Sequence, residues 1–517
     1  MPSEHRLHPA TLLFEIAKHL RNFALPAMLI LLGASQSSGG PAARFGRVPT
    51  GWEVWLLALL VPAVLASIAR YVSFRLRYEG DELVIRSGLL FRNERHIPFS
   101  RIQNLDAVQN VLHRAFDVVE VRVETGGGKD EEARLSVLPR AAFDEMRQRV
   151  IEGRTGARPD VRALPNPETA AAPGETLVHL PLRELLLCGF LENRGLVLIS
   201  AAYGALWQAG MFESATERLF GGAEAFSRGF LRDLLRAFVD GGPLPLGSIA
   251  VAAIGLAGLL MFVRFVSMVW ALVRLYDFRL IGVGNDLRTT FGLFTRVTAT
   301  IPIHRVQTIT IRQGPLHRWL HRAAVTVETA GGRRSQSRAR DREWLAPLVV
   351  QPSLPGLLQG IVPDLDLHAV SWQPVHSRAF RRAVKPMLVL VAVVTIASAP
   401  LLGRGALAVM MPLLAWAVIR ARMYVATLAW AESAEVVLMR SGWLWRQATI
   451  ARVNKIQSIT LAESPFDRRA AMARVRVDTA GAGPLSHRVD IPYLDRDVAG
   501  RLAARLATQA ASSAFRW

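Results

Sequence analysis

Long apolar segments alternate with polar segments three times along this 517-residue chain. A helix needs about 20 mainly apolar residues to cross the hydrocarbon core of a bilayer. Six segments approach that length, and they fall into the pairs 23–39 with 52–69, 185–207 with 249–270, and 384–402 with 406–419. The pattern therefore predicts six transmembrane helices. The first is the weakest, and a signal peptide cut near Ser35 is the alternative, although its basic flank would be unusually long.

The polar segments that follow each pair show a different period. In the first, apolar residues alternate with polar ones over 97–105 and 119–123, which is typical of short antiparallel strands. Residues 139–152 then begin with proline and place apolar side chains on one helical face, with expected counterparts at 340–350 and 493–506. We therefore expect a small β-sandwich or partly open barrel, capped by a C-terminal helix, after each pair.

The three polar segments align without gaps around a shared glutamine. A glycine precedes this glutamine by 15 residues, an arginine follows it by 11 and a threonine by 22. The shared positions are Gly88, Gln103, Arg114 and Thr125 in the first segment, Gly292, Gln307, Arg318 and Thr329 in the second, and Gly442, Gln457, Arg468 and Thr479 in the third. Such spacing indicates three copies of one unit, here called the first, second and third repeats.

Proline-rich and glycine-rich linkers place the boundaries between the repeats. The chain is expected to be an α+β membrane protein of three tandem repeats, each a transmembrane pair followed by a β domain with a C-terminal helix. The expected parts are a juxtamembrane helix with the first pair at 1–72, the first domain at 73–152, a linker at 153–175, the second pair at 176–275 with an amphipathic outer loop at 209–248, the second domain at 276–350, a linker at 351–374, the third pair at 375–423 and the third domain at 424–510.

A helix pair that leads into a domain with this glycine, Arg/Lys-x-Gln and Val-x-Val-x-Thr-Gly pattern resembles the bacterial pleckstrin-homology (PH) membrane-protein family of the YdbS/YdbT type, in its long three-repeat form. The resemblance covers nearly the whole chain. It implies a seven-stranded PH-like fold with a C-terminal helix, cytoplasmic domains and a smaller one-domain companion protein. It also suggests a role in envelope protection or resistance to antimicrobial peptides.

The third repeat departs from the shared pattern at two positions. Arg452 stands where the other repeats have Pro98 and Pro302, and Asp467 stands where they have His113 and His317. If this edge of the domain binds a ligand, the third repeat is expected to have lost it.

Composition narrows the class of protein. Only 20% of the residues are charged and the mean hydropathy is +0.24, whereas a soluble domain has about 25% charged residues. The net charge of +20 favours a polyanionic partner, either nucleic acid or an anionic membrane surface. The basic residues lack regularly spaced aromatic neighbours, which argues against nucleic acid. The single cysteine, Cys188, excludes an internal disulfide and a multi-cysteine metal site.

The placement of the basic residues predicts orientation, because cytoplasmic flanks of membrane helices are enriched in Lys and Arg. The connectors within the three pairs hold only seven of the 62 Lys and Arg, whereas basic residues cluster at the far ends of the helices, at Arg70, Arg75, Arg77, Arg274, Arg279, Arg378, Arg381, Arg382, Lys385, Arg420 and Arg422. We expect a protein of the bacterial inner membrane with both termini and all three domains in the cytoplasm. Residues 211–240 have the spacing of an amphipathic helix, although a solvated spacer would share it.

The sequence shows no catalytic or cofactor motif in a suitable context, so we expect no enzyme activity, cofactor or metal site. The repeated glutamines are interpreted as ties within their own domains rather than as a recognition edge. The repeated arginines, with Arg101, Arg305 and Lys455, would either face anionic lipid headgroups or pair with nearby acidic residues.

Two charged residues are expected inside the membrane, Glu192 in the third predicted helix and Arg264 in the fourth. An isolated charge at that depth is costly, so we predict that the two side chains pair. The alternative is that both reach the interface by snorkelling.

The leading functional hypothesis is a non-enzymatic scaffold whose three domains bind one another, a companion protein, a second copy or anionic lipids of the inner leaflet. A transporter or channel built around Glu192 and Arg264 is the alternative. It is disfavoured because the repeats are parallel and each has an even number of helices.

Overall fold

The structure is a computed structural model, and part of the chain is described in it. The described residues are 4–5, 8–14, 64–88 except 66 and 70, 92–125, 133–156, 175–208, 229–230, 233, 246–329, 344–403 except 364 and 368, 405–480 and 489–512. The chain divides into two compact units, which are residues 1–173, 192–276 and 290–299 in one and residues 174–191, 277–289 and 300–517 in the other.

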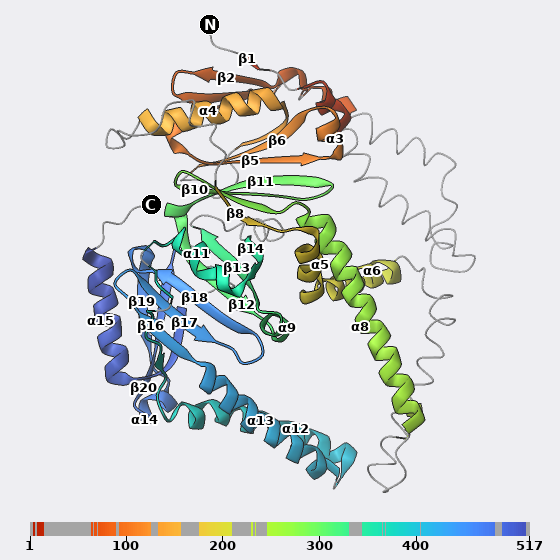
Figure 1. Cartoon of the computed structure of the whole chain (residues 1–517), viewed down its shortest axis with the longest axis vertical. Helices are drawn as coiled ribbons and strands as arrows, with labels where there is room; N and C mark the ends of the chain where they lie inside the picture. The colour runs from red at the N-terminus through yellow and green to blue at the C-terminus, as the bar shows by residue number, and fades with distance from the viewer. Residues whose placement is uncertain are drawn as a thin grey trace. The chain divides into compact units, whose positions relative to one another are not determined.

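The first domain is formed by two half-sheets and a helix (Figure 1). Its elements are β2 (Arg75–Glu79), β3 (Glu82–Ser87), β4 (Asn93–Pro98), β5 (Ile102–Asn110), α3 (Val111–Ala115), β6 (Val118–Thr125), β7 (Ala133–Pro139) and α4 (Arg140–Gly156). All neighbouring strands in each half are antiparallel. Leu76 and Leu83 of the first half, Val121 of the second and Met146 of α4 share one hydrophobic core. The predicted sandwich with a C-terminal helix is therefore present here.

The second and third domains repeat this order of elements. The second has β9 (Arg279–Val283), β10 (Asp286–Phe291), β11 (Thr295–Pro302), β12 (Val306–Gln313), α9 (Pro315–Trp319), β13 (Arg322–Thr329), β14 (Trp344–Val350) and α11 (Leu354–Gln359). The third has β16 (Ala429–Glu432), β17 (Val436–Ser441), β18 (Arg446–Arg452), β19 (Ile456–Ala462), α14 (Pro465–Arg469), β20 (Met472–Thr479), β21 (Val489–Asp495) and α15 (Arg496–Ser512). The third domain has its own core, which includes Trp430, Val475 and Leu502.

A short strand upstream of each membrane segment adds to the domain that follows that segment. These strands are β1 (Glu4–His5), β8 (Glu175–His179) and β15 (Gln373–Pro374), and they pair antiparallel with β2, β9 and β16. Each is the seventh strand of its domain. The chain segment between β8 and β9 therefore begins and ends at the same strand pair, and so does the segment between β15 and β16.

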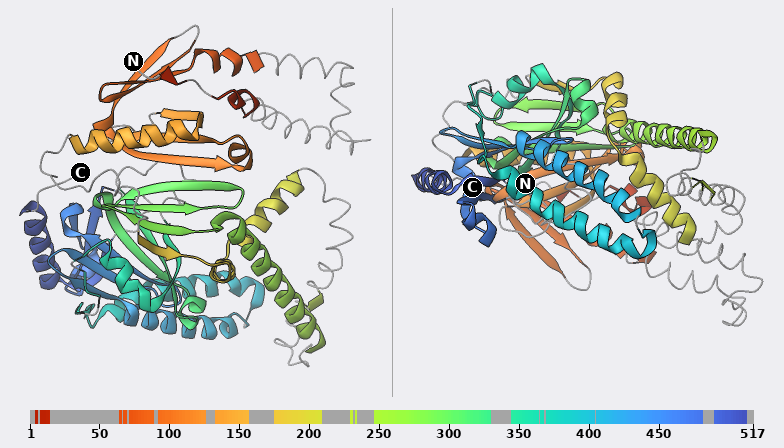
Figure 2. Two further views of the ribbon diagram at one scale, coloured as in Figure 1. Left: turned by 45° about the horizontal axis from the view of Figure 1, so that its top comes forward. Right: turned by 90° about the horizontal axis from the view of Figure 1, so that it is seen from below.

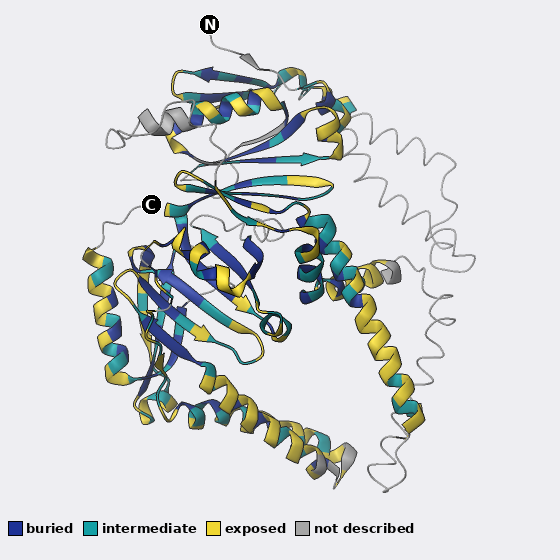
Figure 3. Cartoon of the chain, viewed as in Figure 1, coloured by how far each residue is buried: buried dark blue, intermediate teal, exposed yellow. Residues whose placement is uncertain are grey.

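The helices that fall in the predicted membrane segments, within the described residues, are α5 (Leu182–Leu191), α6 (Arg194–Gln208), α8 (Leu246–Leu275), α12 (Ala379–Leu402) and α13 (Gly405–Thr427). Three of them hold segments long and apolar enough to span a bilayer, and α5 with α6 would form a fourth span as one bent pair. α12 and α13 lie side by side (Figure 2). Exposed side chains dominate along α8, α12 and α13 (Figure 3), as expected of surfaces that contact lipid.

Two expectations were wrong. Residues 344–350 form strand β14 rather than a helix, because the five central residues of Trp-Leu-Ala-Pro-Leu-Val-Val are buried in succession and the segment pairs with β13. The helix expected over 185–207 is broken at 192–193, where Glu, Asn and Arg follow one another. The first helix pair, except residues near 64–73, and almost all of the loop 209–248 lie outside the described residues.

Candidate functional site

Successive domains are joined edge to edge by strand pairing at two places. β5 of the first domain pairs antiparallel with β11 of the second, and Ala107 opposes Thr298. β12 of the second domain pairs antiparallel with β18 of the third, and Ile311 opposes Ala448. Ala107 and Ile311 each lie four residues after the repeated glutamine, and Thr298 and Ala448 each lie six after the repeated glycine. The two junctions therefore have the same register.

The repeated arginines reach across these junctions. The Nη2 atom of Arg114 donates to the carbonyl oxygen of Leu293 at 2.6 Å. The Nη2 atom of Arg318 donates to the carbonyl oxygen of Leu444 at 3.3 Å. A guanidinium that binds a backbone carbonyl fixes position without depending on the partner's side chain. The same arginine thus ties the first domain to the second and the second to the third.

Gly292 and Gly442 lie one and two residues before the carbonyls of Leu293 and Leu444 that the arginines bind. Gly88, Gly292 and Gly442 all have positive φ, at 98°, 112° and 90°. A Cβ atom would lie 2.0 Å from the carbonyl oxygen of Thr295 at Gly292 and 1.9 Å from that of Trp445 at Gly442. Only glycine fits such a turn, both because of the left-handed backbone and because of this close approach.

Each repeated glutamine occupies a break in strand register. The ladder shifts between Ile102 and Asn104, between Val306 and Thr308, and between Ile456 and Ser458. Gln307 is buried, and its Nε2 atom donates to the carbonyl oxygen of Arg305 at 3.3 Å. Gln457 is exposed, and the side chain of Gln103 lies outside the described residues.

The repeated threonines mark the other end of the same hairpins. Thr125, Thr329 and Thr479 are the last residues of β6, β13 and β20. Each pairs with the first residue of the preceding strand. Position in the ladder accounts for their spacing from the glutamines.

The departure at Arg452 adds a contact to the second junction. Its Nη1 atom donates to the carbonyl oxygen of Ile303 at 3.3 Å, and its Nη2 atom donates to that of Ile361. Both carbonyls belong to the second repeat. A proline, as at Pro98 and Pro302, has no side-chain donor for this purpose.

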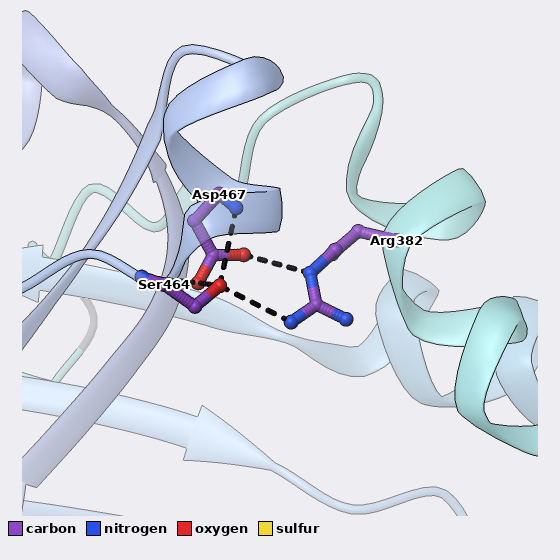
Figure 4. A network of polar contacts seen from close by, with 3 residues as sticks. All are labelled: Arg382, Ser464 and Asp467. Carbon is purple, nitrogen blue, oxygen red and sulfur yellow. Dashed lines mark hydrogen bonds and ion pairs between the residues drawn. The ribbon is translucent and has the colours of Figure 1, made fainter.

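The departure at Asp467 holds a membrane helix against the third domain (Figure 4). The Nε atom of Arg382 on α12 lies 2.8 Å from Oδ1 of Asp467 on α14, and Arg382 Nη2 donates to Ser464 Oγ at 3.4 Å. Ser464 and Asp467 also form the capping box of α14. We call this group of three residues the third-repeat latch.

The environment keeps Asp467 ionised. Burial acts to raise its pKa, but hydrogen bonds from Ser464 and Arg382 and the charge of Arg382 outweigh it, so the pKa lies below its usual value. The equivalent His113 and His317 differ, because burial lowers the pKa of each and favours the neutral ring. The third repeat has thus exchanged a neutral group for a carboxylate that binds arginine.

A second latch holds α5 against the second domain. Glu184 of α5 accepts two hydrogen bonds from Arg322 of β13, at 3.0 Å from Nε and 2.7 Å from Nη2. This contact raises the pKa of Arg322. The thiol of Cys188, one turn further along α5, is buried and lies 3.9 Å from the carbonyl oxygen of Pro347. The pair Glu184 and Arg322 is called the second-repeat latch.

The first repeat uses aromatic contact at the corresponding place. Phe14, at the end of the described N-terminal helical residues, lies with its ring centroid 4.3 Å from that of His113 and 6.2 Å from that of Phe116, both next to or in α3. In the first and third repeats, the segment that leads towards the membrane contacts the short helix that follows β5 or β19. In the second repeat, α5 contacts β13 and β14 instead.

The predicted intramembrane partners lie close together at the helix break. The Nη1 atom of Arg264 donates to the backbone carbonyl oxygen of Glu192 at 3.2 Å and to Oδ1 of Asn193. The carboxylate of Glu192 lies 2.6 Å from Nε of Arg194. Arg264 therefore binds a backbone carbonyl at the C-terminal end of α5, where carbonyl groups have no partner within the helix.

Close packing supports this arrangement. The backbone nitrogen of Gly195 donates to Ser267 Oγ at 2.7 Å, and Ser267 donates to the carbonyl oxygen of Val263 at 2.9 Å. A Cβ atom on Gly195 would lie 2.1 Å from the Val263 oxygen. Small residues at this crossing let α6 and α8 approach closely, as at other helix interfaces in membranes.

Sequence reasoning missed the two latches and the role of Arg452. The one available signal was the departure of Arg452 and Asp467 from the repeated pattern, which we interpreted as the loss of a ligand. For the second-repeat latch no such signal exists, because Glu184 and Arg322 are far apart in the sequence. In the described parts of the chain, no cluster of three or more His, Cys, Asp or Glu is arranged to hold a metal ion.

Comparison with known proteins agrees with the repeats. The bacterial PH domain family matches residues 25–154, 235–348 and 384–510. The UPF0699 transmembrane protein YdbT of Bacillus subtilis (strain 168) is 24% identical over 383 residues, which cover 71% of each chain. No solved structure matches. Three family matches, each covering a domain and apolar residues before it, show that this chain is a transmembrane member of the bacterial PH domain family.

Proposed function

We propose that this protein is a non-enzymatic scaffold of the bacterial inner membrane, whose PH-like domains are joined into a platform on the cytoplasmic side. The observation that carries the proposal is the strand junction, which occurs twice with one register and one arginine contact. Domains joined through paired backbones are linked by more than the flexible linkers that connect separate modules.

The strand pairs at the base of each membrane segment support a common side for the domains. β8 pairs with β9 and β15 pairs with β16, so the residues between them start and finish at one place. Such an excursion crosses the membrane an even number of times. Six spans with cytoplasmic termini follow if the first repeat behaves in the same way, and the placement of Lys and Arg favours this orientation.

Labelling of introduced cysteines tests the orientation. Ser100, Asn285 and Gln457 are exposed residues of the first, second and third domains. Each is changed to cysteine in a separate variant. The native Cys188 is buried, so it should not react with the label. A membrane-impermeant maleimide is expected to label none of them in intact spheroplasts and all of them after the inner membrane is opened. Labelling of any domain in intact spheroplasts would contradict a cytoplasmic platform.

Two kinds of partner fit this scaffold differently. Arg114 and Arg318 already bind carbonyls at the junctions, and Lys455 is buried, so these groups offer little to anionic headgroups. Protein partners, either a smaller PH-domain companion or a second copy, are therefore favoured over lipid. Flotation with vesicles cannot test lipid binding by the domains of a full-length chain that itself spans the membrane. Co-purification from native membranes is therefore the experiment that tests for a protein partner.

The physiological setting that we propose is protection of the cell envelope, including resistance to antimicrobial peptides. A deletion strain is expected to be more sensitive to cationic peptides and to recover when the full chain is supplied. Unchanged sensitivity would remove this role and leave the scaffold proposal intact.

A transporter or channel is a second candidate, supported by one specific observation. Broken membrane helices that present backbone groups to a charged residue are a feature of transporters, and Arg264 binds the carbonyl of Glu192 at such a break. If this arrangement serves transport, ion or solute flux into proteoliposomes should occur and should be lost in Arg264→Ala. The scaffold proposal expects no flux in either protein.

A further inference from the structure

Two of the edge strands among the described sheets are equivalent to strands that form the internal junctions. β4 is the last strand of the sheet β1-β2-β3-β4, and β19 is the first of the sheet β19-β20-β21. By position in the repeat, β4 is equivalent to β11 and β18, and β19 is equivalent to β5 and β12. Each internal junction pairs a strand of the β5 type with a strand of the β11 type. The chain has one further strand of each type, and each lies at the edge of its sheet. We call them the β19 edge (residues 456–462) and the β4 edge (residues 93–98).

The β19 edge exposes what the internal junctions bury. Leu461 lies four residues after Gln457, at the position held by Ala107 and Ile311 in the two junctions. Ala107 and Ile311 are 7% and 8% exposed, whereas Leu461 is 46% exposed. A long strand edge with exposed apolar side chains and a row of backbone donors and acceptors is a site for adding another strand.

The β4 edge carries the opposite half. Residues 93–96 of β4 are all exposed. Glu94 lies six residues after Gly88, at the position held by Thr298 and Ala448, which oppose Ala107 and Ile311. The register of the internal junctions would therefore place Glu94 opposite Leu461.

Charge at the end of the two edges is complementary. In the internal junctions, Arg296 opposes Gln109 and Arg446 opposes Gln313. The equivalent residues at the two unused edges are Arg92 and Glu463. Glu463 lies 3.0 Å from Arg496 in its own domain, and Arg92 is exposed. A neutral glutamine inside the chain is thus replaced by an acid where the partner strand would come from another molecule.

We propose that the β19 edge of one copy pairs antiparallel with the β4 edge of a second copy, in the register of the two internal junctions. This contact is heterologous, so it links copies head to tail in the plane of the membrane. A second copy is the occupant because one chain supplies both halves, with matching register and with opposite charges at Arg92 and Glu463. The inference deepens the proposed scaffold and rests on it in one respect, which is that all domains lie on the same side of the membrane.

Disulfide crosslinking in native membranes tests the register directly. Opposed residues in an antiparallel pair have Cα atoms about 4.5–5.5 Å apart, which suits a disulfide. Two differently tagged full-length copies, both with Cys188→Ala, would carry Leu461→Cys in one and Glu94→Cys in the other. Mild oxidation is expected to give a reducible dimer that contains both tags. A chain that carries both substitutions is expected to give a ladder of higher multimers.

Three controls define the result. Ala107→Cys with Thr298→Cys in one chain is the matched internal pair and should close a disulfide within the molecule. Leu461→Cys with His96→Cys is displaced by two residues along the edge and should crosslink less. Leu461→Lys should abolish the dimer formed by Ala462→Cys and Asn93→Cys, which are the neighbouring opposed pair in the same register.

The outcomes separate this inference from the scaffold proposal. If the internal disulfide closes and no dimer forms at Leu461 and Glu94, the head-to-tail contact is wrong. Capture of a different protein by Leu461→Cys, without a second copy, would also overturn it. If maleimide labelling places the domains on both sides of the membrane, the scaffold proposal itself fails, whatever the crosslinking shows.

Discussion

The second-repeat and third-repeat latches hold the same kind of contact with opposite polarity. In the second repeat the membrane helix supplies the acid, Glu184, and the domain supplies the base, Arg322. In the third repeat the helix supplies the base, Arg382, and the domain supplies the acid, Asp467. Both repeats therefore keep an ion pair between helix and domain, although the residues that form it differ.

The two acids also differ in the other hydrogen bonds that they make. Glu184 binds Arg322 through both oxygens and is confined to that pair. Asp467 binds Arg382 and also completes the capping box with Ser464. The third-repeat latch therefore couples the docking of α12 to the start of α14, and its disruption should have the larger consequence.

Reversal of one charge gives the largest expected effect. Arg382→Glu places a carboxylate beside Asp467, and both side chains are only about one-fifth exposed, at 23% and 19%. Loss of one partner from a fully buried pair destabilises by about 3–5 kcal/mol, so we expect about 2–3 kcal/mol here after allowing for solvent. The fall in Tm of the purified full chain in detergent measures it.

The swap of both charges is the matched control for that reversal. Arg382→Glu with Asp467→Arg gives the third repeat the polarity of the second, and it should recover the part of the lost Tm that comes from the ion pair but not the part that comes from the cap of α14. A double variant no more stable than the single ones would show that polarity is fixed by surroundings other than the pair.

Truncation of the acids should rank the latches. Asp467→Ala removes an ion pair and a helix cap, whereas Glu184→Ala removes an ion pair alone. We expect Asp467→Ala to destabilise more, by about 1 kcal/mol, which is the usual contribution of a cap. Equal losses of Tm in the two variants would contradict the double role of Asp467.

The cap itself is tested at Ser464. Ser464→Ala should destabilise by about 1 kcal/mol, whereas glycine is tolerated at an N-cap with a loss of a few tenths. Ser464→Gly reproduces the second repeat, where Gly314 precedes α9 without a side-chain cap. Both variants lose the Oγ cap and the hydrogen bond to Arg382, so the difference in Tm between them measures the backbone preference for glycine over alanine at this N-cap.

Acid is expected to have a smaller effect on Tm, through the third-repeat latch, than any of the substitutions above. The pKa of Asp467 is lower in the folded protein than its usual value. Its contribution is therefore present above that usual value, about 3.9, and is lost as the pH falls through the folded pKa. Below about pH 4, the Tm of the wild type should fall more steeply than that of Asp467→Asn. Parallel curves would show that Asp467 is not the titrating group.

Local pattern was sufficient for part of this fold. The spacing of Gly88, Gln103 and Thr125 reflects a turn, a register break and a strand end, each of which imposes its own residue within one hairpin. The same reasoning failed at Trp344–Val350, where a short buried apolar run can be either strand or helix. It also missed the break at Glu192, because a few polar residues do not interrupt a long apolar average.

The junctions and latches could not be predicted for a different reason. Arg114 binds a carbonyl of Leu293, and any residue at that position would supply the same carbonyl. Pairing of β5 with β11 depends on which edge lies open after each domain has folded, which no local period records. Contacts made through the backbone leave few traces in the identity of their partners.

The strand pairs at the base of the membrane segments also set an order of synthesis. β8 ends at His179 and its partner β9 starts at Arg279, so the second domain cannot close its sheet until the intervening hundred residues have emerged. At about 5–20 residues per second, that delay lasts several seconds. Synthesis of the second and third helix pairs thus precedes completion of the domain behind each, so a chain whose helices do not return to their strand pair keeps an unfinished sheet.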